Sequence, residues 1–269
     1  MATIGFIGAG NMAEAIIKGL ISKKVYSCDE INISDISDNR LDYMKSAYGI
    51  NAFKYNNLVV SSSDMAVLAV KPQIAGEVLE SLDDFPCDKP VISIAAGLKI
   101  KKITDLLGDI PVIRVMPNTP ALVGWGAAGL FANKKGEKHL PDAQKIFSAI
   151  GEAFVLSSEE DMNIVTALSG SGPAYFFLFM EEMINAAVEL GLDEKTASEL
   201  TMQTALGAAM LAKHRSDAGE KPEDLRRKVA SPGGTTEAAL KELENNQLGA
   251  IVMLAVSRAK QRSEELSEV

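Results

Sequence analysis

The chain opens with a short apolar run that turns through two glycines directly into a helical pattern. The run is Ile4–Ile7, and the turn and helix start are Gly8–Ala13. Strand, glycine turn and helix in this order are the context that the G-x-G-x-x-G/A pattern requires. Gly8 permits the tight turn, Gly10 lets a pyrophosphate approach the backbone, and Ala13 keeps the helix close to the strand. We therefore expect a dinucleotide site here; the alternative is a tight strand–helix turn without a ligand.

The second expected strand, 30–35, ends in an acidic residue. Asp35 lies about 20 residues or a little more past the glycines, where a carboxylate typically holds the ribose hydroxyls of NAD. It would repel the 2′-phosphate of NADPH, although Arg40 is close enough in sequence to offset that repulsion. The expected cofactor is NADH or NADPH, with NADH favoured. The alternative is that Asp35 only caps the following helix.

Apolar runs and helical patterns alternate along the first half of the chain, which predicts a Rossmann-like α/β domain with a doubly wound, parallel sheet. Further strands are expected at 64–70, 91–95, 111–115, 129–132 and 153–156, the last two at an edge. Ligands of such sheets bind beyond the carboxyl ends of the strands. The expected cofactor residues are Gly8, Gly10, Asn11, Met12, Asp35, Ala69, Val70, Lys71, Pro72, Ala95, Gly97, Met116, Pro117 and Asn118. Lys71 either contacts a cofactor phosphate or is simply solvated.

Strand patterns disappear after about Ser158, and everything that follows is helical. We therefore expect a dinucleotide-binding domain over 1–158 and an all-helical domain over 159–269. Its helices are expected at 172–190, 193–214, 225–229, 236–244 and 248–265. Small residues along 193–214 indicate close helix contacts, some of them with a second subunit. The alternative is that this surface is entirely internal core.

Composition excludes several classes of protein. The 269 residues are 47% hydrophobic, ample for a core, and the net charge of −9 argues against a nucleic-acid partner. No apolar run reaches the roughly 18 residues that a membrane span needs, and no signal peptide is evident. Cys28 and Cys87 have no Cys or His neighbours at metal-binding spacing. They indicate free thiols in the cytoplasm, and no metal site is expected.

A second ligand loop is expected at Ser231–Thr236. Its Pro-Gly-Gly run cannot lie inside a helix, and a helix start follows with Thr236 as its cap and Glu237 in the first turn. Amides and hydroxyls at a helix N-terminus form a site for a small anion.

Five motifs, in this order, resemble the pyrroline-5-carboxylate reductase family almost end to end. They are Ile7–Met12, Ala69–Gln73, Arg114–Pro120, Leu168–Tyr175 and Ser231–Thr236. The resemblance implies a Rossmann domain and a helical dimerisation domain, in a homodimer that often assembles into rings of dimers. It implies NAD(P)H-dependent reduction of 1-pyrroline-5-carboxylate, a five-membered cyclic imine that carries a carboxylate, to L-proline.

The resemblance also implies roles for residues. The loop Ser231–Thr236 matches the family's carboxylate-binding loop, and Thr236 matches the threonine whose hydroxyl approaches the ring nitrogen. The Ser231 hydroxyl and the amides of Gly233, Gly234 and Thr235 are suited to grip the carboxylate. Met116, Pro117 and Asn118 match the stretch beside the nicotinamide.

Two departures from the family pattern stand out. The family often has Ser-Asn-Arg at the end of the second strand, a sequence that suits NADPH, whereas this chain has Ser34-Asp35-Ile36. Trp125 stands where the family often has an acid, and the sequence assigns it no role.

Three other functions compete with this one. A beta-hydroxyacid dehydrogenase needs a catalytic Lys on its long interdomain helix, and 169–190 contains none. A general imine reductase has less reason for an anion loop, and a non-catalytic nucleotide sensor has no need of a second ligand loop. Ser169–Pro173 is expected to be a helix-start loop lining the cleft rather than a nucleophile, since no base stands near it in sequence.

Overall fold

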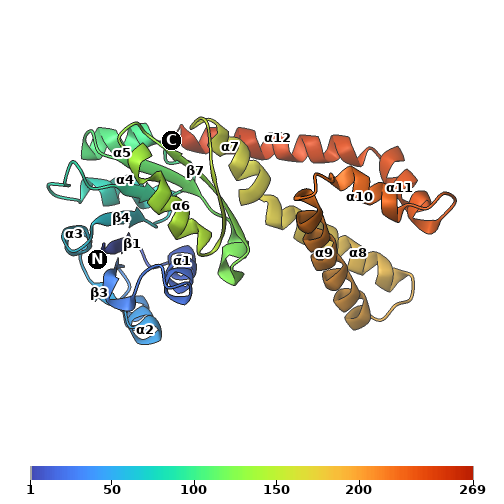
Figure 1. Cartoon of the computed structure of the whole chain (residues 1–269), viewed down its shortest axis with the longest axis horizontal. Helices are drawn as coiled ribbons and strands as arrows, with labels where there is room; N and C mark the ends of the chain where they lie inside the picture. Colours follow the sequence, from blue (N-terminus) through green and yellow to red (C-terminus); the bar gives the residue numbers. More distant parts are fainter. Residues whose placement is uncertain (1, 269) are drawn as a thin grey trace. The chain divides into compact units, whose positions relative to one another are not determined.

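A computed structural model describes residues 2–268, which fall into two compact units (Figure 1). The first unit holds the chain up to Pro173 together with the segment from Arg258 onward, and the second unit is Ala174–Ser257. The division therefore falls inside two long helices, α8 (Gly172–Glu189) and α12 (Leu248–Ser267).

Within residues 2–268, the first unit is built on an eight-stranded sheet of order β3-β2-β1-β4-β5-β6-β7-β8. Its strands are β1 (Ile4–Ile7), β2 (Ile31–Ser34), β3 (Asn51–Phe53), β4 (Met65–Leu68), β5 (Val91–Ser93), β6 (Val112–Met116), β7 (Gly126–Ala132) and β8 (Gly151–Val155). All neighbouring strands are parallel except β6 and β7, which pair antiparallel. Three details differ from expectation: β3 was not predicted, the β6–β7 pair is antiparallel in a sheet expected to be parallel, and β7 lies inside the sheet, with only β8 at that edge.

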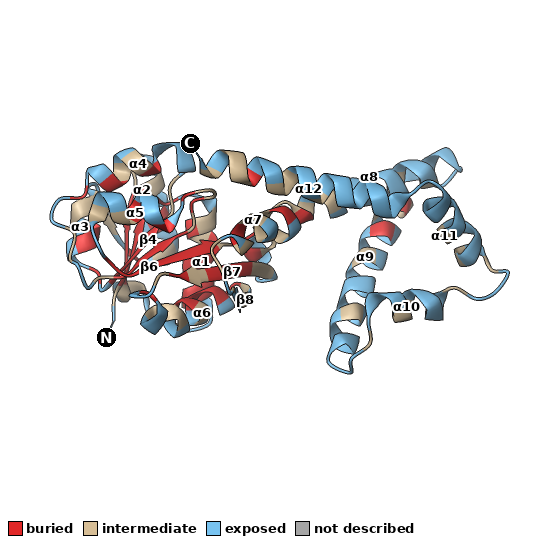
Figure 2. Ribbon diagram, turned by 90° about the horizontal axis from the view of Figure 1, so that it is seen from above, coloured by how far each residue is buried: buried red, intermediate tan, exposed pale blue. Residues whose placement is uncertain are grey.

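Helices cover both faces of this sheet. Those with bounds not yet given are α1 (Asn11–Ser22), α2 (Asp38–Tyr48), α3 (Asn56–Ser61), α4 (Pro72–Glu80), α5 (Ile100–Leu107), α6 (Leu140–Ser148) and α7 (Asp161–Val165). Short 3-10 helices lie at η1 (Cys28–Glu30), η2 (Thr119–Val123) and η3 (Glu137–His139), and a π-helical turn at η4 (Thr166–Gly170). One buried cluster joins the sheet to α1, α2 and α6, and a second joins it to α3, α4 and α5 (Figure 2). Phe6 belongs to the first cluster and Ile7 to the second, so the strand alternates between two apolar faces.

The first unit extends past residue 158, where the sequence predicts the domain boundary, because a partly buried ion pair holds the next segment to the sheet. Arg114 on β6 is only 7% exposed, and its guanidinium lies 2.7 Å from the Glu159 carboxylate. The same carboxylate accepts a hydrogen bond from the Ile100 amide at 2.8 Å. The end of the chain also belongs to this unit: the Ser263 hydroxyl donates to the Asn163 side chain at 2.8 Å.

The second unit consists of α9 (Glu194–Ser216), α10 (Pro222–Val229), α11 (Thr235–Asn245) and the adjoining parts of α8 and α12. Among residues 174–257, only Ala197 and Thr201 are buried (Figure 2). Large apolar side chains are exposed instead on α8, α9 and α12: Phe176, Phe177, Leu178, Phe179, Leu200, Leu206, Met210, Ile251, Met253 and Leu254. No helix among the described residues combines the length and apolar character needed to span a bilayer.

Candidate cofactor and substrate sites

The glycine turn after β1 has the shape that a dinucleotide site needs. Gly8 has φ +96°, and a Cβ there would lie 2.7 Å from the Ala69 carbonyl oxygen, so no other residue fits without strain. Gly10 is the N-cap of α1, and a Cβ on it would meet nothing within 4 Å. No described side chain caps α1, which leaves its first amides open to an anion. The turn therefore fits a pyrophosphate.

Asp35 and Arg40 form hydrogen bonds with the backbone amide and carbonyl of Ala9 within this turn. One Asp35 carboxylate oxygen accepts a hydrogen bond from the Ala9 amide and the other from the Ser37 amide, both at 2.9 Å. The Arg40 Nε donates to the Ala9 carbonyl oxygen at 2.5 Å. The N-cap of α2 is Ser37. Asp35 thus orders the glycine turn and is not merely a helix cap.

Glu14 holds Arg40 in this position. The Glu14 carboxylate forms an ion pair with the Arg40 guanidinium and accepts hydrogen bonds from Tyr43 at 3.0 Å and Tyr48 at 2.7 Å. Partial burial acts to raise the pKa of Glu14, but the hydrogen bonds from Tyr48, Arg40 and Tyr43 outweigh it and lower that pKa below its ordinary value. Glu14, Tyr43 and Tyr48 were not predicted as site residues, because no local pattern links α1 to α2.

The turns after β4 and β5 differ in accessibility. Lys71, the N-cap of α4, is exposed, and its ammonium has no ion pair or hydrogen bond among residues 2–268. Ala69 and Val70 are half-buried, and Pro72 opens α4. Ala95 is buried, whereas Gly97 has φ +77° and faces the last turn of α12: its Cβ would lie 3.2 Å from the Leu266 carbonyl oxygen. Glycine at position 97 therefore also allows the close approach of α12 within the first unit.

The end of β6 is joined to the turn at Ser169–Gly170. Asn118 is 8% exposed; its amide nitrogen donates to the Ser169 carbonyl at 3.0 Å and its oxygen accepts from the Ala127 amide at 2.9 Å. A Cβ on Gly170 would lie 2.6 Å from the Met116 Cε. Asn118 thus shapes this turn through both ends of its side chain, while Met116 stays partly exposed and Pro117 is buried.

Two backbone amides of the expected substrate loop, which lies in the second unit, donate hydrogen bonds within the chain. The Gly234 amide donates to the Ser231 carbonyl at 2.9 Å, and the Gly233 amide donates to the Glu237 carboxylate at 2.6 Å. Gly233 has φ +72°, which favours glycine. The loop therefore holds a carboxylate oxygen on one of its backbone amides.

The expectation that Thr236 caps the following helix is wrong. Gly234, with extended φ and ψ of −84° and 171°, is the N-cap of α11, so the helix begins at Thr235 and Thr236 lies inside its first turn. The Thr236 hydroxyl has no hydrogen-bond partner in the part of the chain that the structure describes. Its half-buried side chain is free to act on a ligand.

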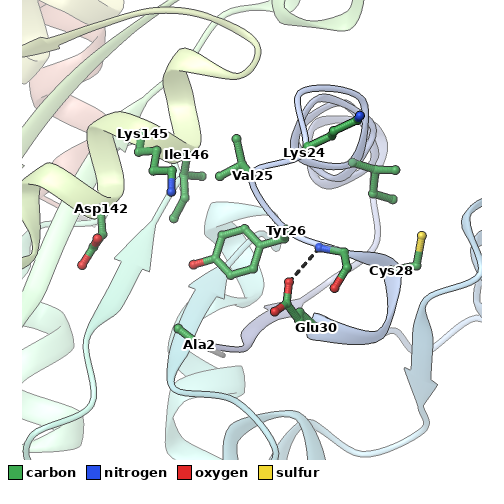
Figure 3. Close-up of a pocket in the computed structure, with 11 residues that line it drawn as sticks. Ala2, Lys24, Val25, Tyr26, Cys28, Glu30, Asp142, Lys145 and Ile146 are labelled. Atoms are coloured by element: carbon green, nitrogen blue, oxygen red, sulfur yellow. Dashed lines mark hydrogen bonds between the residues drawn. The ribbon is translucent and has the colours of Figure 1, made fainter.

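A separate cavity of about 660 Å³ lies at the amino edge of the sheet, opposite the strand-end turns (Figure 3). Tyr26 stands in it between Glu30 and the α6 residues Asp142 and Lys145. Burial, followed by the charge of Asp142, raises the pKa of Tyr26 above its ordinary value. None of the expected site residues lines this cavity.

Two family models match the chain. Residues 159–266 match the model described as pyrroline-5-carboxylate reductase dimerisation, and residues 3–97 match the model described as NADP oxidoreductase, coenzyme F420-dependent.

Characterised relatives cover the chain from end to end. The pyrroline-5-carboxylate reductase of Pseudomonas aeruginosa is 44% identical over 98% of this chain and 97% of its own length. A solved pyrroline-5-carboxylate reductase from Coxiella burnetii is 40% identical, with a TM-score of 0.93 over 100% of this chain and 99% of that one. The Plasmodium falciparum pyrroline carboxylate reductase, solved with NADP bound, is 32% identical, with a TM-score of 0.86 over 99% and 98% of the two chains.

Replacement of each glycine of the first turn by alanine should affect a different quantity: folding free energy at Gly8 and nucleotide affinity at Gly10. Gly8→Ala should cost about 1–3 kcal/mol of folding free energy, since a side chain is strained there and meets a backbone carbonyl. Gly10→Ala should cost less than about 1 kcal/mol, because the Cβ has room, yet it should weaken NAD⁺ binding about tenfold by filling the approach to the α1 amides. Urea unfolding and calorimetric titration measure the two quantities. Unchanged nucleotide affinity in Gly10→Ala would contradict the placement of the pyrophosphate at this turn.

Proposed function

The chain belongs to the pyrroline-5-carboxylate reductase family, and on that premise we propose that it reduces 1-pyrroline-5-carboxylate to L-proline with a nicotinamide nucleotide. The observation that carries this function is the 44% identity to a curated reductase across 98% of the chain, which includes both ligand loops. The competing functions lack such support, because none of them accounts for a dinucleotide turn and a carboxylate loop in one chain.

The cofactor, when bound, supplies a hydride to the imine carbon of the substrate. The protein's part at this end is binding and orientation. The open amides of α1 beyond Gly10 receive the pyrophosphate, where the positive end of the helix dipole favours it. Asp35 stands at the end of β2, where its remaining lone pairs can accept hydrogen bonds from ribose hydroxyls.

The substrate carboxylate binds on the loop Ser231–Thr236. It replaces the Glu237 carboxylate on the Gly233 amide and takes further hydrogen bonds from the Ser231 hydroxyl and the Thr235 amide. The Thr236 hydroxyl, which has no other described partner, orients the imine nitrogen or its proton. A threonine hydroxyl is too weak an acid to protonate the nitrogen, so the proton comes from water or is already on the imine.

We propose that NADH serves this enzyme at least as well as NADPH. The Asp35 carboxylate would repel a 2′-phosphate: at an effective dielectric of about 20, two unit charges about 4 Å apart cost about 4 kcal/mol before screening. Ile36, at the position where the family often has an Arg, is 90% exposed and offers no charge. Arg40 already pairs with Glu14.

The second unit supports a homodimer, and further assembly into a ring of dimers is part of the same proposal. With Ala197 and Thr201 as its only described buried residues, this unit has no core of its own. Apolar surface of this extent is covered by a partner in stable proteins. The match of 159–266 to a dimerisation family makes a second copy the natural cover.

We also propose a cytoplasmic location. Cys28 and Cys87 are both free thiols, which suits a reducing compartment.

The direct test of the function is turnover. Purified protein with 1-pyrroline-5-carboxylate and NADH or NADPH should oxidise the nucleotide and form L-proline, measured by absorbance loss and chromatography. The acyclic imine formed from an amine and an aldehyde, which carries no carboxylate, should be reduced poorly. No turnover with either nucleotide would refute the proposed reaction.

Thr236 provides a test of the substrate loop. Thr236→Val should lower kcat by about 10- to 100-fold, the scale of a lost hydrogen bond to a reacting polar group, with cofactor affinity nearly unchanged. Thr236→Ser keeps the hydroxyl and should retain most of the rate. Equal rates for the Val and Ser variants would assign position 236 to packing alone.

The cofactor preference is measured as the ratio of kcat/KM for NADH and NADPH. Wild type should favour NADH or treat the two alike. Asp35→Asn with Ile36→Arg should move the ratio toward NADPH. Ile36→Arg alone should move it only partly, because the Asp35 charge that repels the phosphate remains; this single change also keeps the hydrogen bonds that Asp35 accepts from the Ala9 and Ser37 amides. A wild type that prefers NADPH tenfold would show that Asp35 does not face the ribose.

Assembly is tested by sedimentation. The protein should contain no monomer at micromolar concentration, and Phe177→Asp or Met253→Asp should dissociate or unfold the helical unit, since both side chains are mostly exposed within one chain. Gln203→Asp at an exposed position of α9 adds the same single negative charge and serves as a control for charge alone. A fully active monomer would contradict the proposal.

A further inference from the structure

Glu14 and Arg40 form a connected pair beside the glycine turn, and the proposed reaction gives neither of them a role. We propose that Glu14 sets the cofactor preference by holding the Arg40 guanidinium in an ion pair, away from the 2′-phosphate that would otherwise recruit it. Glu14 is thus a positioning residue that acts through Arg40. The inference rests on the proposed nucleotide site at Gly8–Gly10 and Asp35.

The geometry places Arg40 beside the ribose end of that site. Its Nε donates to the Ala9 carbonyl at 2.5 Å, while the Asp35 carboxylate accepts from the Ala9 amide at 2.9 Å. Arg40 and Asp35 therefore hold one residue of the turn from its two backbone ends. A guanidinium in this position is the local cation best suited to a 2′-phosphate, since Arg binds phosphate through paired hydrogen bonds.

Glu14 is built to keep that guanidinium. Its carboxylate pairs with the Arg40 Nη2 and is itself held by two phenols, Tyr43 and Tyr48. The Arg40 guanidinium also lies 5.1 Å from the centre of the Tyr43 ring. The ion pair is only partly exposed, at 24% for the Arg40 side chain and 20% for Glu14. Low exposure limits screening by salt, so the pair is stronger than an ordinary surface pair.

The other cation near this end of β2 is also paired. Lys54 donates to the Asp38 carboxylate at 2.5 Å and to the Ile36 carbonyl at 3.2 Å. Lys71, which has no described partner, belongs to the turn after β4 rather than to β2. Removal of the Glu14 charge therefore releases Arg40, and no other described cation, near the ribose 2′ position, the only place where NADP⁺ differs from NAD⁺.

Release of Arg40 should raise the affinity for NADP⁺ relative to NAD⁺, whichever of two new positions its guanidinium takes. The freed Nη2 can pair with the 2′-phosphate directly, or it can turn toward Asp35 and offset the negative charge that repels the phosphate. Loss of the Glu14 charge also makes the pyrophosphate site less negative, but this acts equally on NAD⁺ and NADP⁺. The ratio of the two affinities therefore isolates the contribution of Arg40.

The experiment measures the Kd of NAD⁺ and of NADP⁺ by calorimetry on the intact protein without substrate, so that it is independent of turnover. Glu14→Gln should tighten NADP⁺ relative to NAD⁺ by about fivefold, the scale of a partly exposed ion pair. Glu14→Gln with Arg40→Gln should return the ratio to within about twofold of wild type. Glu137→Gln removes a carboxylate paired with Lys134 at 3.1 Å elsewhere on the unit and should leave the ratio unchanged.

Arg40→Gln alone keeps the inference testable even if Glu14→Gln folds poorly, which thermal melting would reveal. If Glu14 already withholds Arg40, this variant should leave the NADP⁺/NAD⁺ ratio of wild type unchanged; a selective loss of NADP⁺ affinity would show that Arg40 already binds the phosphate and would overturn the inference. An unchanged ratio in folded Glu14→Gln, or a gain that survives the Arg40→Gln change, would also overturn it. None of these outcomes depends on whether the imine is the substrate.

Discussion

The contact between Gly8 and the end of β4 is the constraint on which the candidate nucleotide site depends. The Gly8 amide donates to the Ser34 carbonyl at 2.8 Å, and the absent Cβ leaves the space that the Ala69 carbonyl occupies. Three neighbouring strands, β1, β2 and β4, therefore end at one point. Because of this convergence, the α1 amides, Asp35 and the turn at Ala69 share a single edge, and a residue with a side chain at position 8 would separate them.

The helical unit follows a different principle, because one chain gives it almost no buried core. With Ala197 and Thr201 as its described buried residues, this unit gains little from burial, which supplies most of the free energy of folding. Its exposed Phe, Leu and Met side chains gain that free energy only against a second surface. Under the proposed assembly, folding of this unit and association of the chains are one process.

Much of the candidate site could be predicted, and the residues that escaped share a reason. The glycine turn, the loop at Ser231–Thr236 and Asp35 are recognisable because short-range backbone requirements determine them. Glu14, Tyr43 and Tyr48 escaped because their roles arise between α1 and α2, and the structural role of Asn118 arises between β6, β7 and the turn at Ser169. The start of α11 was misplaced by a residue or two because glycine and threonine are both acceptable N-caps, and the extended backbone of Gly234 decided between them.

By itself, the sequence determined the local elements: the glycine turn after β1, the run of buried strands, the loop at Ser231–Thr236 and the change to an all-helical second half. Periodicity and helix-breaking residues act over a few positions, so they can be recognised without the fold. Only the tertiary structure decided that the first unit runs on to Pro173 and takes back the end of α12, because the Arg114–Glu159 ion pair and the Ser263–Asn163 hydrogen bond join distant segments. It alone decided that Arg40 faces Glu14, since which partner a charge finds depends on what packing places beside it.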